Sequence, residues 1–230
     1  MEFLLDGFVQ AIILLVHLDP ETYSAIRATL WSSSAAMAVS LVLGLPAGFW
    51  LGYHNFYGKH ALRTVVDTLL SLPTVLVGLI VYAFISRQGP LGEMGLLFTL
   101  PGIAVGQAIL AWPVVVALTA TAVESMDRQL SITLRSLGAD RRQLLLSTLW
   151  EARFGILAAG VTAYGRVMTE VGISMMVGGN IKWATRTMTT AIALETNKGM
   201  FATGVALGLV LLAIAFAVNV SLSFLRRQVR

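Results

Sequence analysis

The sequence has no cysteine and little charge. Without cysteine, neither a disulfide framework nor thiol chemistry is possible. Its three histidines, His17, His54 and His60, fall outside the long apolar stretches and form no metal-ligand cluster, which argues against a membrane enzyme or a haem-bearing subunit. A Gly-x-x-x-x-Gly-Lys-Ser/Thr motif for nucleotide is also missing. We therefore expect no metal, no cofactor and no catalytic site in this chain.

More than half of the sequence is apolar. Apolar residues make up 57% of the 230 residues, whereas 12% are charged, and the mean hydropathy is +0.79. A typical soluble domain has about a quarter of its residues charged. One soluble core could not bury this much apolar surface, so lipid must be the solvent. The net charge of +4 suits basic cytoplasmic loops, and no continuous basic patch indicates nucleic acid as a partner.

The hydropathy pattern predicts an all-α integral membrane protein that forms a single domain over residues 1–230. Asp19 and Pro20 form a typical helix start, with an acceptor before a proline. Residues 3–18 are apolar but shorter than the roughly 20 residues needed to span, so we expect an interfacial helix. A sixth, tilted span is the alternative. Five apolar stretches are long enough to cross a bilayer: residues 26–53, 64–85, 101–123, 154–177 and 201–224.

The basic residues predict the orientation, because cytoplasmic loops retain Lys and Arg. With five spans, one side receives five basic residues: Arg27, Arg87, Lys182, Arg186 and Lys198. The other side receives ten: Lys59, Arg63, Arg128, Arg135, Arg141, Arg142, Arg153, Arg226, Arg227 and Arg230. The N-terminus is therefore expected outside and the C-terminus in the cytoplasm of an inner-membrane protein.

Residues 124–153 form a charged loop of a different kind. We expect two short amphipathic helices here, separated at Gly138, where a left-handed conformation would end the first helix. Asp140 and Gln143 have the spacing of a capping box that starts the second helix. Periodicity alone also allows a helical hairpin that rests on the membrane surface.

The turn Ser136-Leu137-Gly138-Ala139 resembles the cytoplasmic coupling motif of binding-protein-dependent ABC importers. Ile132-Thr133-Leu134 replaces the Glu-Ala-Ala of that motif, and Leu149-Trp150 replaces its Leu-Pro. The resemblance implies that this loop docks into a separate ABC ATPase. The implied coupling residues are Arg135, Ser136, Leu137, Gly138, Ala139, Asp140 and Arg141.

From about residue 19 to residue 230, the chain resembles the small type I permeases of the molybdate, tungstate and sulfate group. Residues 170–181 and 187–196 are most similar to tungstate permeases. The resemblance implies a permease that moves an oxyanion, with tungstate favoured over molybdate or sulfate. It also implies a homodimer in the bilayer, two ATPase subunits and an external binding protein. A secondary transporter is the alternative, but we see no repeated halves.

An oxyanion needs hydrogen-bond donors along its route, and many fixed positive charges would hold it too tightly. Candidate path residues are Ser71, Pro73 and Thr74 in the second span and Gln107 in the third, although prolines and hydroxyls are ordinary in membrane helices. Arg166 and Glu170 have i,i+4 spacing in the fourth span. We favour a structural ion pair between them over a role in attracting the anion.

A polar segment at residues 178–199 follows the fourth span on the expected outer side. It contains a short amphipathic stretch that could simply lie at the membrane interface. The alternative is a docking surface for the external binding protein, with Gly179, Asn180, Lys182 and Arg186 as the candidate residues.

Overall fold

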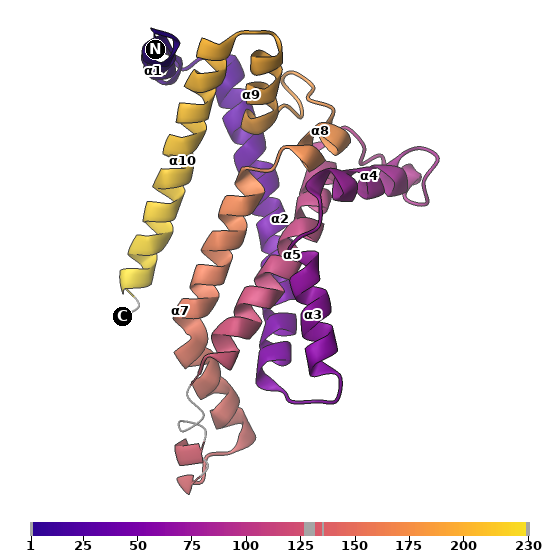
Figure 1. Cartoon of the computed structure of the whole chain (residues 1–230), viewed down its shortest axis with the longest axis vertical. Helices are drawn as coiled ribbons and strands as arrows, with labels where there is room; N and C mark the ends of the chain where they lie inside the picture. Colours follow the sequence, from indigo (N-terminus) through magenta and orange to yellow (C-terminus); the bar gives the residue numbers. More distant parts are fainter. Residues whose placement is uncertain (1, 127–131, 135, 229–230) are drawn as a thin grey trace.

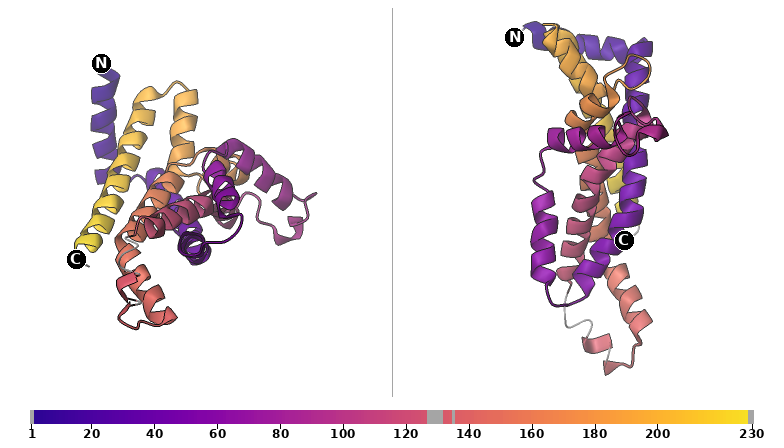
Figure 2. Two further views of the ribbon diagram at one scale, coloured as in Figure 1. Left: turned by 60° about the horizontal axis from the view of Figure 1, so that its bottom comes forward. Right: turned by 90° about the vertical axis from the view of Figure 1, so that its right-hand side faces the viewer.

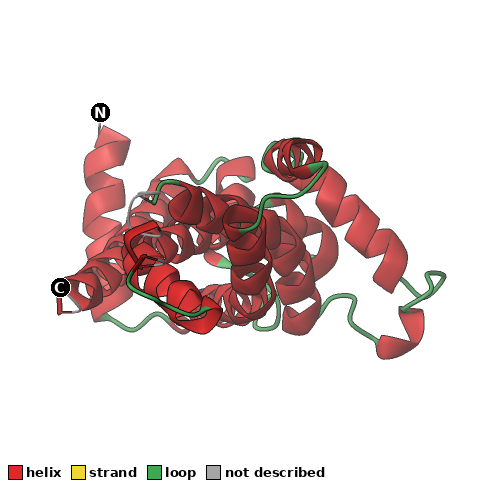
Figure 3. Cartoon of the chain, turned by 90° about the horizontal axis from the view of Figure 1, so that it is seen from below, coloured by secondary structure: helices red, strands yellow, loops and turns green. Residues whose placement is uncertain are grey.

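A computed structural model describes residues 2–126, 132–134 and 136–228, and the side chains of residues 6–126, 132–134 and 136–220. Within these residues the secondary structure is helical, without strands (Figure 3). Four helices are long and apolar enough to cross a membrane: α2 (Pro20–Tyr53), α5 (Leu100–Glu124), α7 (Arg141–Met168) and α10 (Phe201–Gln228). The expected all-α membrane fold is confirmed.

The helix α2 begins where the sequence predicts. Asp19 is its N-cap, with a carboxylate that accepts from the Thr22 amide at 2.8 Å, and Pro20 follows. Packing of α2 against α5 is close because three glycines recur every four residues. A Cβ atom at Gly44, Gly48 or Gly52 would lie 2.6–2.9 Å from α5 atoms, including the backbone carbonyls of Val116 and Ala120. The pair α2–α5 is therefore the unbroken centre of the fold.

Two of the predicted spans are not single straight helices. Instead of one span over 64–85, α3 (Lys59–Leu69) and α4 (Thr74–Ile85) are bent by 93° at a short break, so five spans are reached only if this pair counts as one. The fourth span ends early, because α7 stops at Met168 and α8 (Gly172–Gly178) begins after a gap. Figure 1 shows α4 lying crosswise to the long helices.

The helix α1 (Glu2–Val16) also lies crosswise, along one end of the molecule (Figure 2). Its 15 residues extend about 23 Å, which is short of a roughly 30 Å hydrocarbon core. Its buried Ala11 belongs to an apolar cluster with Leu207 and Val210 of α10. This placement agrees with an interfacial helix and not with a sixth span. At the same end, α9 (Met188–Asn197) occupies the predicted amphipathic stretch.

The opposite end carries the charged loop. Residues 132–134 and 136 are helical, and Gly138 has a φ of 85°. The Ala139 amide donates to the Leu134 carbonyl at 3.0 Å, as in a Schellman helix end. Asp140 and Gln143 form the predicted capping box, with bonds of 2.7 and 2.8 Å. The second loop helix is not separate, however: α7 runs unbroken from Arg141 into the membrane span.

Candidate functional site

The break between α3 and α4 leaves backbone groups without partners in either helix. Pro73 precedes α4 as its N-cap and has no N–H, so it cannot donate the backbone hydrogen bond that a continuous helix would have there. The carbonyl of Leu70 accepts a hydrogen bond from Arg166 Nη2 of α7 at 3.1 Å. Ser71 is exposed and Thr74 is half-buried beside this break. Three of the predicted path residues thus lie at one interruption of the backbone.

The break between α7 and α8 is formed around Glu170, whose side chain is 7% exposed. Its carboxylate Oε1 accepts from the amide of Ile173 at 3.2 Å, at the start of α8. Its backbone carbonyl accepts from the Ser174 hydroxyl at 3.3 Å and the Thr189 hydroxyl at 2.9 Å. These bonds satisfy the groups that the helix interruption leaves free.

The two breaks face each other. A Cβ atom on Gly172 would lie 2.9 Å from Thr74 Oγ1, 3.1 Å from the Val75 amide nitrogen and 3.2 Å from Glu170 Oε1. Only a glycine lets the starts of α4 and α8 come this close. The first turns of two helices, whose leading N–H groups have no partner within their own helix, therefore meet at the same place as Glu170, which accepts from one of them, the Ile173 amide.

Gln107 of α5 contacts the last turn of α7, just before the second break. Its Nε2 donates to the Val167 carbonyl at 3.4 Å, and within the described part of the chain its Oε1 has no partner although the side chain is 2% exposed. The level is near the middle of α2, because the Ser40 hydroxyl donates to the carbonyl of Ala108, the next residue of α5, at 3.1 Å. The structure brings the predicted path residues together around the two helix breaks, at the level of the middle of α2.

The predicted ion pair between Arg166 and Glu170 is wrong. Both residues are described, yet no ion pair of 4.0 Å or less joins them. The i,i+4 spacing holds only while a helix continues, and α7 ends at Met168 between them. Among the described residues, the side chain of Arg166 instead bonds only to the Leu70 carbonyl, which satisfies a donor but does not neutralise the charge.

The outer loop between α8 and α9 holds the four predicted docking residues. Gly179 and Asn180 have positive φ values of 69° and 51°. Glu21 of α2 accepts from Lys182 at 2.6 Å and forms a short ion pair with Arg186, whose Nε donates to Asn180 Oδ1 at 3.2 Å. Both predicted docking cations thus share one carboxylate, which leaves one net positive charge, and they fasten the loop to α2.

The coupling loop presents its turn to solvent. Leu137 is 78% exposed, and nothing lies within 4 Å of the position that a Cβ atom on Gly138 would occupy. Ser136, Asp140 and Arg141 are exposed and Ala139 is half-buried, while Arg135 lies outside the described residues. An exposed apolar leucine at the tip of a polar loop fits a surface that another protein covers.

Sequence reasoning missed Glu21, Leu70 and Gly172. Glu21 directly follows the predicted helix start at Asp19 and Pro20, and no sequence pattern assigns it a further role. The role of Leu70 lies in its backbone carbonyl, which no side-chain pattern reveals. Gly172 follows Glu170 closely, and a glycine beside a buried charge could have indicated a close backbone approach.

Comparison with known proteins decides the family. Residues 44–230 match the family described as binding-protein-dependent transport system inner membrane component. The chain belongs to this family. It is therefore a multi-pass component of the inner membrane, and the expected resemblance to ABC importer permeases is confirmed.

Individual relatives agree over nearly the whole length of this permease. The tungstate uptake system permease protein TupB of Campylobacter jejuni is 48% identical over 95% of this chain and 92% of its own length. TupB of Peptoclostridium acidaminophilum is 37% identical over 99% of this chain and 100% of its own. A bacterial alginate ABC transporter, solved with an alginate-bound periplasmic protein, has a TM-score of 0.73 at 19% identity and covers 98% of this chain and 86% of its own, which shows the shared fold.

Proposed function

We propose that this permease carries tungstate from an external binding protein into the cytoplasm as part of an ABC importer. The two TupB proteins, similar over nearly their full lengths, support the substrate. The family description supports dependence on a binding protein. The chain supplies a path and no chemistry of its own, while a separate ATPase subunit hydrolyses ATP.

The assembly that fits this function has two copies of the chain and two ATPase subunits, because one permease lines only part of a path. Each chain is a single domain with its N-terminus outside and its C-terminus in the cytoplasm. The excess of basic residues on the coupling-loop side supports this orientation. Lys59 supports it too, because it pairs with Glu124 at 3.1 Å near the base of that loop.

The observation that best supports the transport mechanism is the position and the charge of the Arg166 guanidinium. This group lies at two facing helix breaks, and its charge is not neutralised by Glu170. A cation at membrane depth usually faces a cavity or a counter-charge, and a passing oxyanion would supply that charge. The hydroxyls of Ser71 and Thr74 add neutral donors beside it. One cation with neutral donors attracts a dianion without trapping it.

Coupling follows from the continuity of α7. This helix joins Arg141, next to the exposed turn, to Arg166 at the breaks, and the 25 steps between them extend about 38 Å. When the ATPase subunits close on the turn at Gly138, α7 moves as one rigid element. The bond between Arg166 and the Leu70 carbonyl then lengthens or breaks, which opens the path between the facing helix starts.

The outer loop completes the proposal as the docking surface of the binding protein. Glu21 fixes the position of Lys182 and Arg186, so docking depends on the shape of the loop more than on free charge. Gly179 and Asn180 support that shape through their left-handed backbone.

Reconstitution tests this function. The permease, its ATPase and the binding protein are placed in liposomes, and ATP-dependent uptake of tungstate is measured with molybdate or sulfate as competitors. We expect uptake that needs all three proteins, equal numbers of permease and ATPase chains, and preference for tungstate. Uptake by the permease alone would contradict the ABC assignment. Equal uptake of molybdate would mean that these three proteins do not select tungstate.

A further inference from the structure

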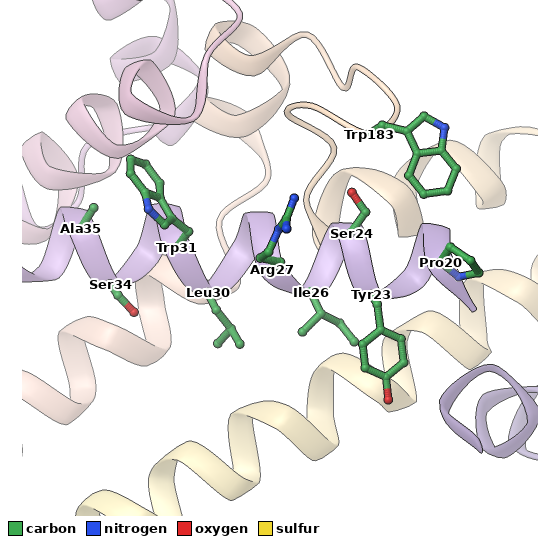
Figure 4. Close-up of a pocket in the computed structure, with 10 residues that line it drawn as sticks. All are labelled: Pro20, Tyr23, Ser24, Ile26, Arg27, Leu30, Trp31, Ser34, Ala35 and Trp183. Carbon is green, nitrogen blue, oxygen red and sulfur yellow. The ribbon is translucent and has the colours of Figure 1, made fainter. Parts of the chain in front are cut away.

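A groove of about 1170 Å³ lies along the outer end of α2. Ten residues line it, nine of them from α2 and one, Trp183, from the loop between α8 and α9 (Figure 4). None of the ten is acidic, and one of them, Arg27, is a cation. The lining of the groove therefore carries a net positive charge.

Arg27 differs from the basic residues that are near it in space or in the same outer region. Lys182 and Arg186 share the carboxylate of Glu21, and Lys198 pairs with Glu195 at 2.7 Å. Arg27 is exposed, and in the described part of the chain it has neither a hydrogen bond nor an ion pair. Its position seven residues after Pro20 places it about 10 Å along the helix. An unpaired arginine at this depth needs an anion or water.

The side chains beside Arg27 supply donors. Ser24, Arg27 and Trp31 share one face of α2 at spacings of three and four residues, and Figure 4 shows all three pointing to the same side of the helix. Guanidinium and indole N–H groups can only donate, and they suit charged oxygen atoms. Trp183 stands near the outer end of this face with a φ of 68°, a conformation that bulky residues rarely adopt.

We infer that Arg27, with Ser24, Trp31 and Trp183, binds a tetrahedral oxyanion group at the outer end of α2. The phosphate of a lipid headgroup and a free oxyanion present the same oxygen atoms, so either can occupy the groove. Tryptophans flank the arginine as they do at membrane interfaces. Binding here requires no transport step, so it stands or fails separately from the proposed function.

Two binding measurements on the purified full-length chain in detergent distinguish the sources. Phospholipid that remains after extensive washing is measured as phosphorus per chain, and tungstate binding to delipidated protein is measured by equilibrium dialysis. We expect Arg27→Gln to reduce retention or affinity about tenfold or more in one of the two measurements, and Arg27→Lys to retain part of it. Loss of retained phospholipid would identify a lipid headgroup as the ligand, and loss of tungstate binding would identify a free oxyanion.

Arg87→Gln is the matched control, because Arg87 is also exposed and unpaired among the described residues but lies in a loop outside the groove. It should bind like the wild type. Folding should survive in both variants, since both side chains are exposed and neither makes a hydrogen bond or an ion pair within the described residues; size-exclusion chromatography checks this. The inference is overturned if Arg27→Gln binds like the wild type in both measurements, or if Arg87→Gln weakens binding as much.

Discussion

The coupling turn and the facing helix breaks both depend on a glycine, and the surroundings of the two residues are opposite. At Gly138 the space around a Cβ atom is empty, but the backbone has a φ of 85°. At Gly172 φ is not in the left-handed region, but Thr74 Oγ1 lies 2.9 Å from where a Cβ atom would be. The turn therefore requires a positive φ at Gly138, whereas the breaks require the space that a side chain at Gly172 would fill. An exposed turn suits a partner protein, and a crowded break suits a gate.

The largest effect is expected from Arg166→Gln, which separates the function of the breaks from their packing. Glutamine can still donate to the Leu70 carbonyl but has no charge. Transport should fall about ten- to a hundredfold while expression and thermal stability stay close to those of the wild type. The double variant Arg166→Gln/Glu170→Gln should be no better, because the two side chains are not paired. Recovery in the double variant would restore the ion-pair interpretation.

Gly172→Ala tests the requirement for space. The added methyl group must push α4 and α8 apart, which should destabilise the protein by about 1–3 kcal/mol and reduce transport. Gly165→Ala in α7 is the control, because nothing lies within 4 Å of its Cβ position. Thermal unfolding in detergent measures both variants. Equal stability of the two would mean that the breaks are not closely packed, and the comparison with Gly138 would fail.

Much of the fold could be predicted from local chemistry. The helix start at Asp19, the turn at Gly138 and the capping box at Asp140 were predicted from a few adjacent residues and are confirmed. The bend at Pro73 was not predicted, because hydropathy is the same for a straight helix and a broken one. A proline shows where a helix can break, while the direction of α4 depends on its packing against α8.

For the candidate site, the residues could be predicted from the sequence, but their partners could not. Arg166 and Glu170 were expected to pair through a continuous helix, and the end of α7 at Met168 changes that geometry. The meeting of Arg166 with Leu70 joins residues 96 positions apart. Contacts of this kind arise from tertiary packing, which no local pattern determines.

Gly138→Val tests the requirement for conformation. A β-branched residue should strain the turn by about 1–2 kcal/mol, because it resists a positive φ. The spans should still insert, while ATPase binding or the link between ATP hydrolysis and transport is lost. Gly138→Asn is the control, since asparagine tolerates the left-handed region and should retain most activity. Co-purification and ATPase activity in liposomes measure both, and normal coupling in Gly138→Val would place the coupling element elsewhere.

The smallest effect on function is expected from a substitution at the outer loop. Ion pairs hold this loop in place, in addition to its residues with left-handed backbone. Glu21→Gln removes the carboxylate that Lys182 and Arg186 share, and such partly exposed pairs each contribute up to about 1 kcal/mol. We expect the loosened loop to bind the external binding protein about two- to fivefold more weakly, with ATPase docking unchanged. Lys182→Gln, which removes only one of the two pairs, should weaken binding less. The sign of the Glu21→Gln effect is decisive: tighter binding would show that the released cations contact the binding protein directly, so that charge and not the shape of the loop governs docking.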